Sequence, residues 1–338
     1  MAYVLSVITA SRSPNSVSGT YIITIPKEWA ENLSLKKGDL VQVELEDNDI
    51  VISSTKSKQI SHSKPMHIEE FKDQKVLELC ITASYIQGND VTEIVSKNKM
   101  GPDQKRWVRK AVDGLIGVEI AEDFADHLVL QNLIDPSKFQ LDELLKKFAE
   151  TSKAVCEDAI RALSNVDLSL SQDAYERGEQ SIKLYRLLMR LALQAAKSKN
   201  VREHMKLHDI SSVIVKIIAI RELGRMAYYA MRIAQHVPEV DKKLDDQLIQ
   251  TIQKLLKTTL EMQDQSLLAL MNKDLLAASA LVDRMVHVRK LYEAAFLMIP
   301  RHNERTAIAL SLIIRDIRAV AGYAVALADD AVLGVFDM

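Results

Sequence analysis

A helical hydrophobic pattern extends over residues 141–335 and constrains the fold of this chain more than any other feature of its sequence. Apolar residues recur there at intervals of three and four, which places them along one face of an α-helix. Clear breaks fall near residues 198–200, 236–238 and 300–303, and we expect about six helices in two groups of three. A segment of this kind buries its apolar faces helix against helix, so we expect a mainly α-helical chain.

The two halves of this helical segment repeat each other. Polar residues match in order and spacing, with Asn165, Asp167 and Arg177 corresponding to Asn272, Asp274 and Arg284. Further along, Arg221-Glu-Leu corresponds to Arg315-Asp-Ile, and Tyr229 to Tyr323. A longer loop near residues 197–202 of the first half explains the changed spacing between the two blocks. The repeat predicts two tandem three-helix bundles, at about residues 141–238 and 245–338.

The first 55 residues have a strand-like pattern instead. Alternating apolar residues predict strands over 21–25, 41–45 and 50–52. Pro26 begins a short predicted helix over 27–32, where its missing N–H costs nothing. So few strands cannot bury a hydrophobic core alone. We therefore expect this module to form a homodimer, with a second copy of itself as the simplest partner.

A polar linker, residues 53–64, separates this module from a segment of mixed pattern. We predict a small α/β domain over residues 66–135. Its predicted elements are strands at 76–81, 117–120 and 128–130 and a helix at 105–112. The expected fold class is thus mainly α, with a small β-containing N-terminal part, a middle α/β domain and the two helical bundles of residues 141–338.

The composition narrows the functional classes. The formal net charge is −2, so any DNA contact must come from a local basic patch. Neither a signal peptide nor an apolar run of roughly 20 residues, the length of a membrane span, is visible. This pattern predicts a cytoplasmic protein with no membrane span. Cys80 and Cys156 lack any Cys-x-x-Cys or histidine spacing, and both are predicted to be buried thiols.

No catalytic motif is visible. The sequence has only 10 glycines, and it contains neither a nucleophile motif nor a phosphate-binding loop. We therefore expect that the protein is not an enzyme. His204 and His208 lie four residues apart, a spacing that can chelate zinc. Because only two ligands are present and Asp209 suits a helix N-cap, the cap is the preferred interpretation.

Three short motifs of the N-terminal module carry a family resemblance. They are Gly19-Thr-Tyr-Ile-Ile-Thr-Ile-Pro-Lys27, Trp29 and Leu33-x-Leu-Lys-Lys-Gly-Asp39. Together they resemble the SpoVT/AbrB swapped-hairpin DNA-binding domain over residues 5–52, which implies a DNA-binding homodimer. Basic side chains would neutralise phosphates and polar ones would reach base edges. The candidates are Arg12, Lys27, Lys36 and Lys37 in the first group, and Asn15, Ser16 and Thr20 in the second. The alternative is a solvated surface, since Glu28 and Glu31 lie nearby.

Residues 141–338 resemble PhoU, the phosphate-uptake regulator, which is built from two three-helix bundles. An AbrB-like module followed by a PhoU-like domain resembles the archaeal type of such regulators. PhoU bundles carry an acidic E-x-x-x-D motif that binds metal clusters. Here Gly224 and Tyr228 stand at the acidic positions of the first copy, and Arg318 and Gly322 at those of the second. Divalent cations prefer several carboxylate oxygens, so we predict that the metal site is lost and that the protein holds no metal or other cofactor.

The same positions supply candidate ligands for an anion. Arg225, Tyr228 and Arg318 offer guanidinium and phenol donors to phosphate or a related oxyanion. Glu222 and Asp316 occupy equivalent positions in the two repeats and are candidate ligand carboxylates. More often, an acid beside an arginine on a helix is a solvated or locally paired charge.

These features lead to one functional hypothesis and two alternatives. The leading hypothesis is a dimeric DNA-binding transcriptional regulator whose PhoU-like domain senses a small ligand, linked by the resemblance to uptake of phosphate or a related oxyanion. The first alternative is a docking regulator of a transporter or kinase, in which the N-terminal module only dimerises. The second is a small-ligand or metal-binding protein, which the lost carboxylates weaken. Salt-dependent DNA binding distinguishes the first two.

Overall fold

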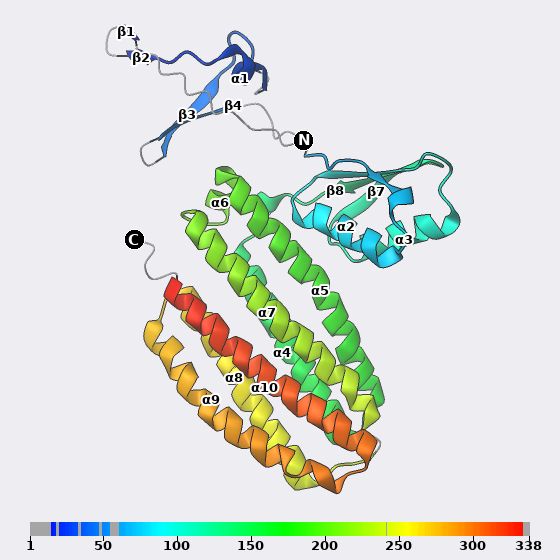
Figure 1. The fold of residues 1–338 in the computed structure, drawn as a ribbon. Helices are drawn as coiled ribbons and strands as arrows, with labels where there is room; N and C mark the ends of the chain where they lie inside the picture. The colour runs from blue at the N-terminus through cyan, green and yellow to red at the C-terminus, as the bar shows by residue number, and fades with distance from the viewer. Residues whose placement is uncertain are drawn as a thin grey trace. The chain divides into compact units, whose positions relative to one another are not determined.

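The chain forms two compact units in a computed structural model, residues 1–59 and residues 60–338, and each is described by itself (Figure 1). The structure describes residues 15–17, 20–32, 35–46, 49–54, 61–240 and 242–333. Arg12 lies outside these ranges, and so do residues 47 and 48 between the predicted strands at 41–45 and 50–52. Of the helices within them, none is both long and apolar enough to cross a membrane.

The described part of the N-terminal unit consists of two short hairpins and one short helix. Strand β1 (Asn15–Val17) pairs antiparallel with β2 (Thr20–Ile22), and β3 (Val41–Glu46) pairs with β4 (Asp49–Ser54). Helix α1 (Lys27–Asn32) matches the predicted helix. The second hairpin is confirmed. The first predicted strand is shorter than expected and ends at Ile22, because Pro26 has no N–H for a strand ladder and begins the helix instead.

The N-terminal unit leaves much of its apolar surface uncovered. Ile23, Trp29, Leu40, Val43 and Ile50 are each more than half exposed. Among the described residues of the segment 15–54, none belongs to a buried core. Apolar side chains that a unit cannot bury by itself are a physical reason to expect a partner surface, and the simplest partner is a second copy of the unit.

A four-stranded sheet covered by two helices occupies residues 61–135, all of which are described. The strand order is β5 (Met66–His67), β6 (Val91–Val95), β8 (His127–Asn132) and β7 (Val118–Asp123), and β5 is parallel to β6. Helices α2 (Gln74–Ile86) and α3 (Pro102–Asp113) share a hydrophobic core with the sheet (Figure 1). The predicted helix at 105–112 and the strands near 118 and 128 are confirmed.

The predicted strand at 76–81 is wrong, because these residues lie within α2. Their alternation fits a strand, but Leu77, Ile81 and Tyr85 recur every four residues and are buried. Asp73 caps the helix by accepting a hydrogen bond from a backbone N–H of its first turn. Cys80 of α2 is partly exposed, so the prediction that it is buried is also wrong. Cys156 is buried as predicted.

The predicted linker at 53–64 is shortened from both sides. Strand β4 continues to Ser54. At the other end, His62 forms a β-bridge to Val91 of the middle sheet, and Ser61 accepts backbone hydrogen bonds from Asp90 and Val91. Residues 61–63 therefore belong structurally to the second unit.

Among the residues described after position 140, six long helices form the two predicted bundles. The first contains α4 (Leu141–Asn165), α5 (Leu168–Lys197) and α7 (Ile210–His236). The second contains α8 (Asp246–Asn272), α9 (Leu275–Phe296) and α10 (Glu304–Leu333). The short α6 (Lys199–His204) occupies the longer loop of the first repeat. The bundles share one core, with α7 beside α10 and α4 beside α8 (Figure 1).

The repeat is also visible where the helices join. The first helix of each bundle ends at a residue in the left-handed conformation, Val166 (φ 57°) and Lys273 (φ 54°). An aspartate follows and caps the second helix in both cases. The equivalent caps are Asp167 and Asp274 for the second helices, and Asp209 and Asn303 for the third. The sequence repeat is therefore a repeat of local structure.

Cationic side chains of α5 hold the middle domain through backbone carbonyl groups. Arg190, which is fully buried, donates to the carbonyl oxygens of Tyr85 (2.6 Å) and Asn89 (2.9 Å), near the end of α2. Two further contacts join Arg186 to the Gly114 carbonyl and Lys197 to the Gln87 carbonyl. Carbonyl groups at helix C-termini carry a partial negative charge, which makes cations favourable partners there.

Candidate functional site

The described DNA-binding candidates lie on exposed parts of the N-terminal unit. Lys27 begins α1 with its side chain 88% exposed, and its ammonium lies 3.7 Å from a Glu31 carboxylate oxygen. An exposed pair of this kind is weak, so the ammonium stays available to a phosphate. Lys36 and Lys37 are exposed in the turn before Gly38, whose φ of 95° favours glycine.

The other candidates are placed only through the backbone. Asn15 and Ser16 lie in β1, and Thr20 lies in β2, so the polar candidates belong to one hairpin. Arg12 lies outside the described residues. The assignment of all seven residues to DNA contacts stays a prediction.

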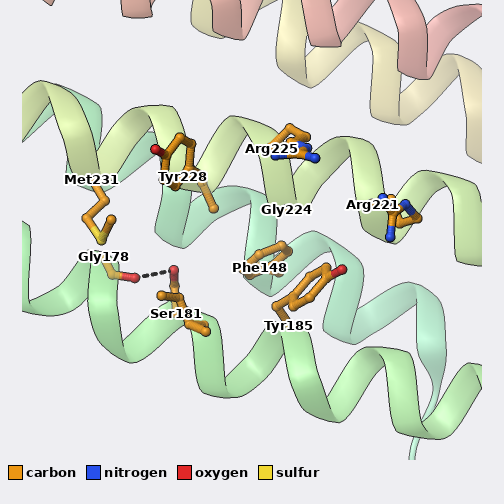
Figure 2. A pocket seen from close by; sticks show the side chains of 11 residues that line it. Phe148, Gly178, Ser181, Tyr185, Arg221, Gly224, Arg225, Tyr228 and Met231 are labelled. Carbon is orange, nitrogen blue, oxygen red and sulfur yellow. Dashed lines mark hydrogen bonds between the residues drawn. The ribbon is translucent and has the colours of Figure 1, made fainter. Parts of the chain in front are cut away.

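A cavity of about 320 Å³ opens between α5 and α7 of the first bundle (Figure 2). Phe148 of α4 lines its inner end and is only 1% exposed. Two of the predicted ligand residues, Arg225 and Tyr228, line the cavity from α7. Arg221 lines it as well, although the sequence analysis did not select this residue. Its position four residues before Arg225 could have identified it, since residues four apart lie on the same face of a helix.

The cavity has a cationic rim. Arg221 and Arg225 are both exposed, and neither guanidinium forms an ion pair with a carboxylate in the described ranges. On the cavity wall, the Ser181 hydroxyl already donates to the Gly178 carbonyl at 2.6 Å. The guanidinium groups and the phenols of Tyr228, which is 45% exposed, and Tyr185 are therefore donors that a bound molecule can use.

Two glycines let the walls of the cavity approach each other. A Cβ atom at Gly224 would lie 2.7 Å from the Tyr185 ring, and one at Gly178 would lie 2.8 Å from Cβ of Met231. Distances below 3 Å force a neighbour to move. Gly224, which the sequence analysis treated only as the replacement of a metal-binding acid, thus also has a packing role against Tyr185.

The structure does not bring Arg318 into this cavity. Arg318 is exposed on α10, and its guanidinium carbon lies 5.1 Å from the centre of the Tyr292 ring in the second bundle. Arg225 lines the cavity of the first bundle, whereas Arg318 does not line it and packs over a ring of the second bundle, so the two arginines do not form one site.

Asp316 is fully buried at the seam between the bundles. Its carboxylate accepts hydrogen bonds from Arg315 at 2.9 and 3.0 Å and lies 3.1 Å from Nε of Arg232 on α7. A carboxylate paired in this way joins α7 to α10, and it is not exposed to a ligand from solvent. In this environment Asp316 stabilises the packing of α7 against α10 and does not act as a ligand carboxylate.

Glu222, the equivalent of Asp316, has a different environment. Burial raises the pKa of Glu222, while Arg221 and Arg225 lower it. Across the seam, burial together with the charges of Glu222 and Asp329 raises the pKa of Asp330 to about 6. The two equivalent positions thus differ: Asp316 is paired with arginines, whereas Glu222 forms no ion pair among the described residues.

The histidine pair gives no metal site in the structure. Among the described residues, no group of three or more His, Cys, Asp and Glu side chains is arranged to hold a metal ion. Nδ1 of His204 lies 2.8 Å from the Asn200 carbonyl oxygen. Asp209 accepts the backbone N–H of Ser212 at 2.7 Å, so its predicted role as a helix cap is confirmed.

A hairpin unit joined to a pair of three-helix bundles defines a modular protein, and known families match both parts. Residues 16–60 match the family described as antidote-toxin recognition MazE, bacterial antitoxin. Residues 145–237, which cover the first bundle, match the PhoU domain. No curated protein matches the chain significantly. The resemblance to an AbrB/MazE-type module and a PhoU domain is confirmed, whereas nothing in these matches supports an archaeal origin.

Solved structures agree with the helical part. PhoU from Pseudomonas aeruginosa is 15% identical, with a TM-score of 0.50 over 57% of this chain and 93% of that chain. The phosphate transport system regulatory protein PhoU from Streptococcus pneumoniae is 16% identical, with a TM-score of 0.49 over 58% of this chain and 93% of that chain. At this level of identity the first likeness shows the fold alone, and it confirms the predicted fold class.

Proposed function

We propose that this protein is a homodimeric DNA-binding transcriptional regulator whose PhoU-like domain binds phosphate or a related oxyanion. The observation that carries this proposal is the presence, in one chain, of an AbrB/MazE-type module and a PhoU-type domain. When a DNA-binding unit is joined to a ligand-binding domain, the protein can exist in two conformational states that differ in their affinity for DNA. A ligand that binds one of these states more tightly then changes how much of the protein is bound to DNA. DNA binding that weakens steeply with salt tests the proposal.

The oxyanion site of this proposal consists of Arg221, Arg225 and Tyr228. Guanidinium groups offer paired donors that suit an oxyanion, and both arginines lack an ion-pair partner in the described ranges. Arg318 and Asp316 are not part of this site, since one lies in the second bundle and the other is buried against Arg232. Glu222 lies beside the site and is not proposed as a ligand of the anion.

Removal of residues 1–59 is expected to convert a dimer into a monomer. The exposed apolar residues of the N-terminal unit need a partner surface, and their loss removes the proposed interface. A truncated chain that begins at Ile60 keeps the bridge between His62 and Val91. Light scattering of both chains measures the mass. A truncated chain that remains fully dimeric would show that the main interface lies elsewhere.

Purified protein is expected to contain no stoichiometric iron or zinc. Gly224, Tyr228, Arg318 and Gly322 provide none of the carboxylates that such clusters need. Elemental analysis after expression in medium rich in both metals measures the content. Stoichiometric metal that disappears in Glu222→Ala would instead indicate a metal site that includes Glu222.

Two exposed valines on α9 favour a second candidate function, the docking of a partner such as a transporter or kinase. Val282 and Val286 lie one turn apart on the same side of the helix and are 51% and 59% exposed. An intact dimer without measurable DNA affinity would favour this candidate over the regulator.

A further inference from the structure

We infer that the cavity between α5 and α7 binds a small organic anion, an oxyanion head carried on a flat apolar body, in preference to inorganic phosphate. This inference rests on the proposed oxyanion site and names the class of its ligand. It follows from the volume of the cavity, from the separation of its charged and apolar parts, and from a comparison of the two bundles.

The volume exceeds what an inorganic oxyanion fills. The cavity measures about 320 Å³, whereas sites for small organic molecules begin at about 300 Å³. One water occupies about 30 Å³ in the liquid, so a tetrahedral oxyanion held at the rim would leave most of the cavity to water. Water against apolar walls is replaced favourably by an apolar group.

The walls separate charge from apolar surface. Arg221 and Arg225 form the cationic side, and both come from α7 (Figure 2). The remainder is largely aromatic and aliphatic, with Phe148, Tyr185 and Met231 around the interior. An anion with an aromatic body places its head against the guanidinium groups and its ring against these side chains. Inorganic phosphate has no apolar body, so it can use only the guanidinium groups.

The second bundle carries different side chains at the corresponding positions. Arg318 stands at the place of Gly224 and packs over Tyr292, which is the counterpart of Tyr185. By the same spacing, Met285 replaces Gly178, and Ala319 replaces Arg225. The cavity is therefore not a consequence of bundle geometry alone. Each repeat has two arginines at these positions, but they are placed differently. In the first repeat Arg221 and Arg225 line the cavity beside Gly178 and Gly224, whereas in the second repeat Arg318 and Met285 take the places of the two glycines.

Calorimetric titration of the full chain with phenyl phosphate, inorganic phosphate and phenol tests this inference. We expect phenyl phosphate to bind at least about tenfold more tightly than inorganic phosphate, because burial of the ring adds to the contacts of the head. Phenol, which lacks the charged head, is expected to bind more weakly than phenyl phosphate. Arg225→Ala should weaken both phosphates about tenfold or more. Tyr228→Ala should weaken phenyl phosphate more than inorganic phosphate.

Arg318→Ala is the matched control, since it removes an exposed helical arginine from the equivalent groove of the second bundle. It should leave both affinities unchanged. Equal affinities for the two phosphates would overturn the inference and leave the proposed oxyanion site standing. Equal losses in Arg225→Ala and Arg318→Ala would place the ligand outside this cavity and overturn it as well. Binding of neither phosphate would overturn the inference together with the oxyanion site, while DNA affinity of the same preparation reports separately on the regulator.

Discussion

Replacing Arg190 by alanine is expected to lower the free energy of unfolding of the second unit by about 3–5 kcal/mol. The guanidinium is fully buried and donates to the carbonyl oxygens of Tyr85 and Asn89. It also lies 3.2 Å from the Asp90 carboxylate and 5.0 Å from the centre of the Tyr85 ring. Without it, the Tyr85 and Asn89 carbonyl groups at the end of α2 each lose a charged donor inside the protein. A buried polar group left without a hydrogen-bond partner lowers the stability by more than a typical hydrogen bond raises it.

Urea denaturation followed by circular dichroism measures this loss, with two variants for comparison. Arg186→Ala is the matched control, because Arg186 reaches the same middle domain from the same helix through one hydrogen bond of 2.9 Å to Gly114. We expect that variant to lose about 1 kcal/mol. Arg190→Lys keeps the charge but not the planar guanidinium group, so its stability should lie between those of the original chain and Arg190→Ala. If Arg190→Ala is as stable as Arg186→Ala, the buried guanidinium does not fix the middle domain to α5.

The helical part of the fold was predictable because its signals are local. Apolar spacing, the capping residues Asp167 and Asp274, and the repeat itself all report on the same helices. The segment 76–81 was misassigned because alternation over six residues fits a strand. The deciding signal was the cap at Asp73, followed by buried residues four apart. The short strands β1 and β5 have too few residues to show any periodicity.

The candidate site was predictable only within one helix. Arg225 and Tyr228 are three residues apart on α7, and the structure places both on the cavity. Contacts between helices were not predictable, because they depend on how α7 packs against α10. Tyr229 stacks on Tyr323 with ring centres 5.7 Å apart, so equivalent residues meet at the seam. This packing gives Asp316 its partner Arg232, and it separates Arg225 from Arg318.

DNA binding by the full chain is expected to weaken roughly 10- to 100-fold in Lys27→Glu, to a similar extent for all DNA sequences. Lys27 is one of the proposed phosphate contacts, with an 88% exposed side chain at the start of α1. The reversal replaces an attraction to phosphate by a repulsion in both subunits of the proposed dimer. Because each phosphate contact adds about one to the salt slope of log affinity, the slope should fall by about two per dimer.

Fluorescence anisotropy with mixed-sequence DNA at several salt concentrations measures both quantities. Lys254→Glu is the control, since Lys254 is also an exposed helical lysine and its reversal changes the net charge of the chain equally. If only the total charge matters, both variants lose affinity together. If Lys27 is a phosphate contact, Lys254→Glu keeps the salt slope of the original chain. The slope should then be smaller in Lys27→Glu and smaller again in the double variant Arg12→Glu/Lys27→Glu. An unchanged affinity in the double variant would remove these two residues from the DNA interface and leave the hairpin unit as a dimerisation module.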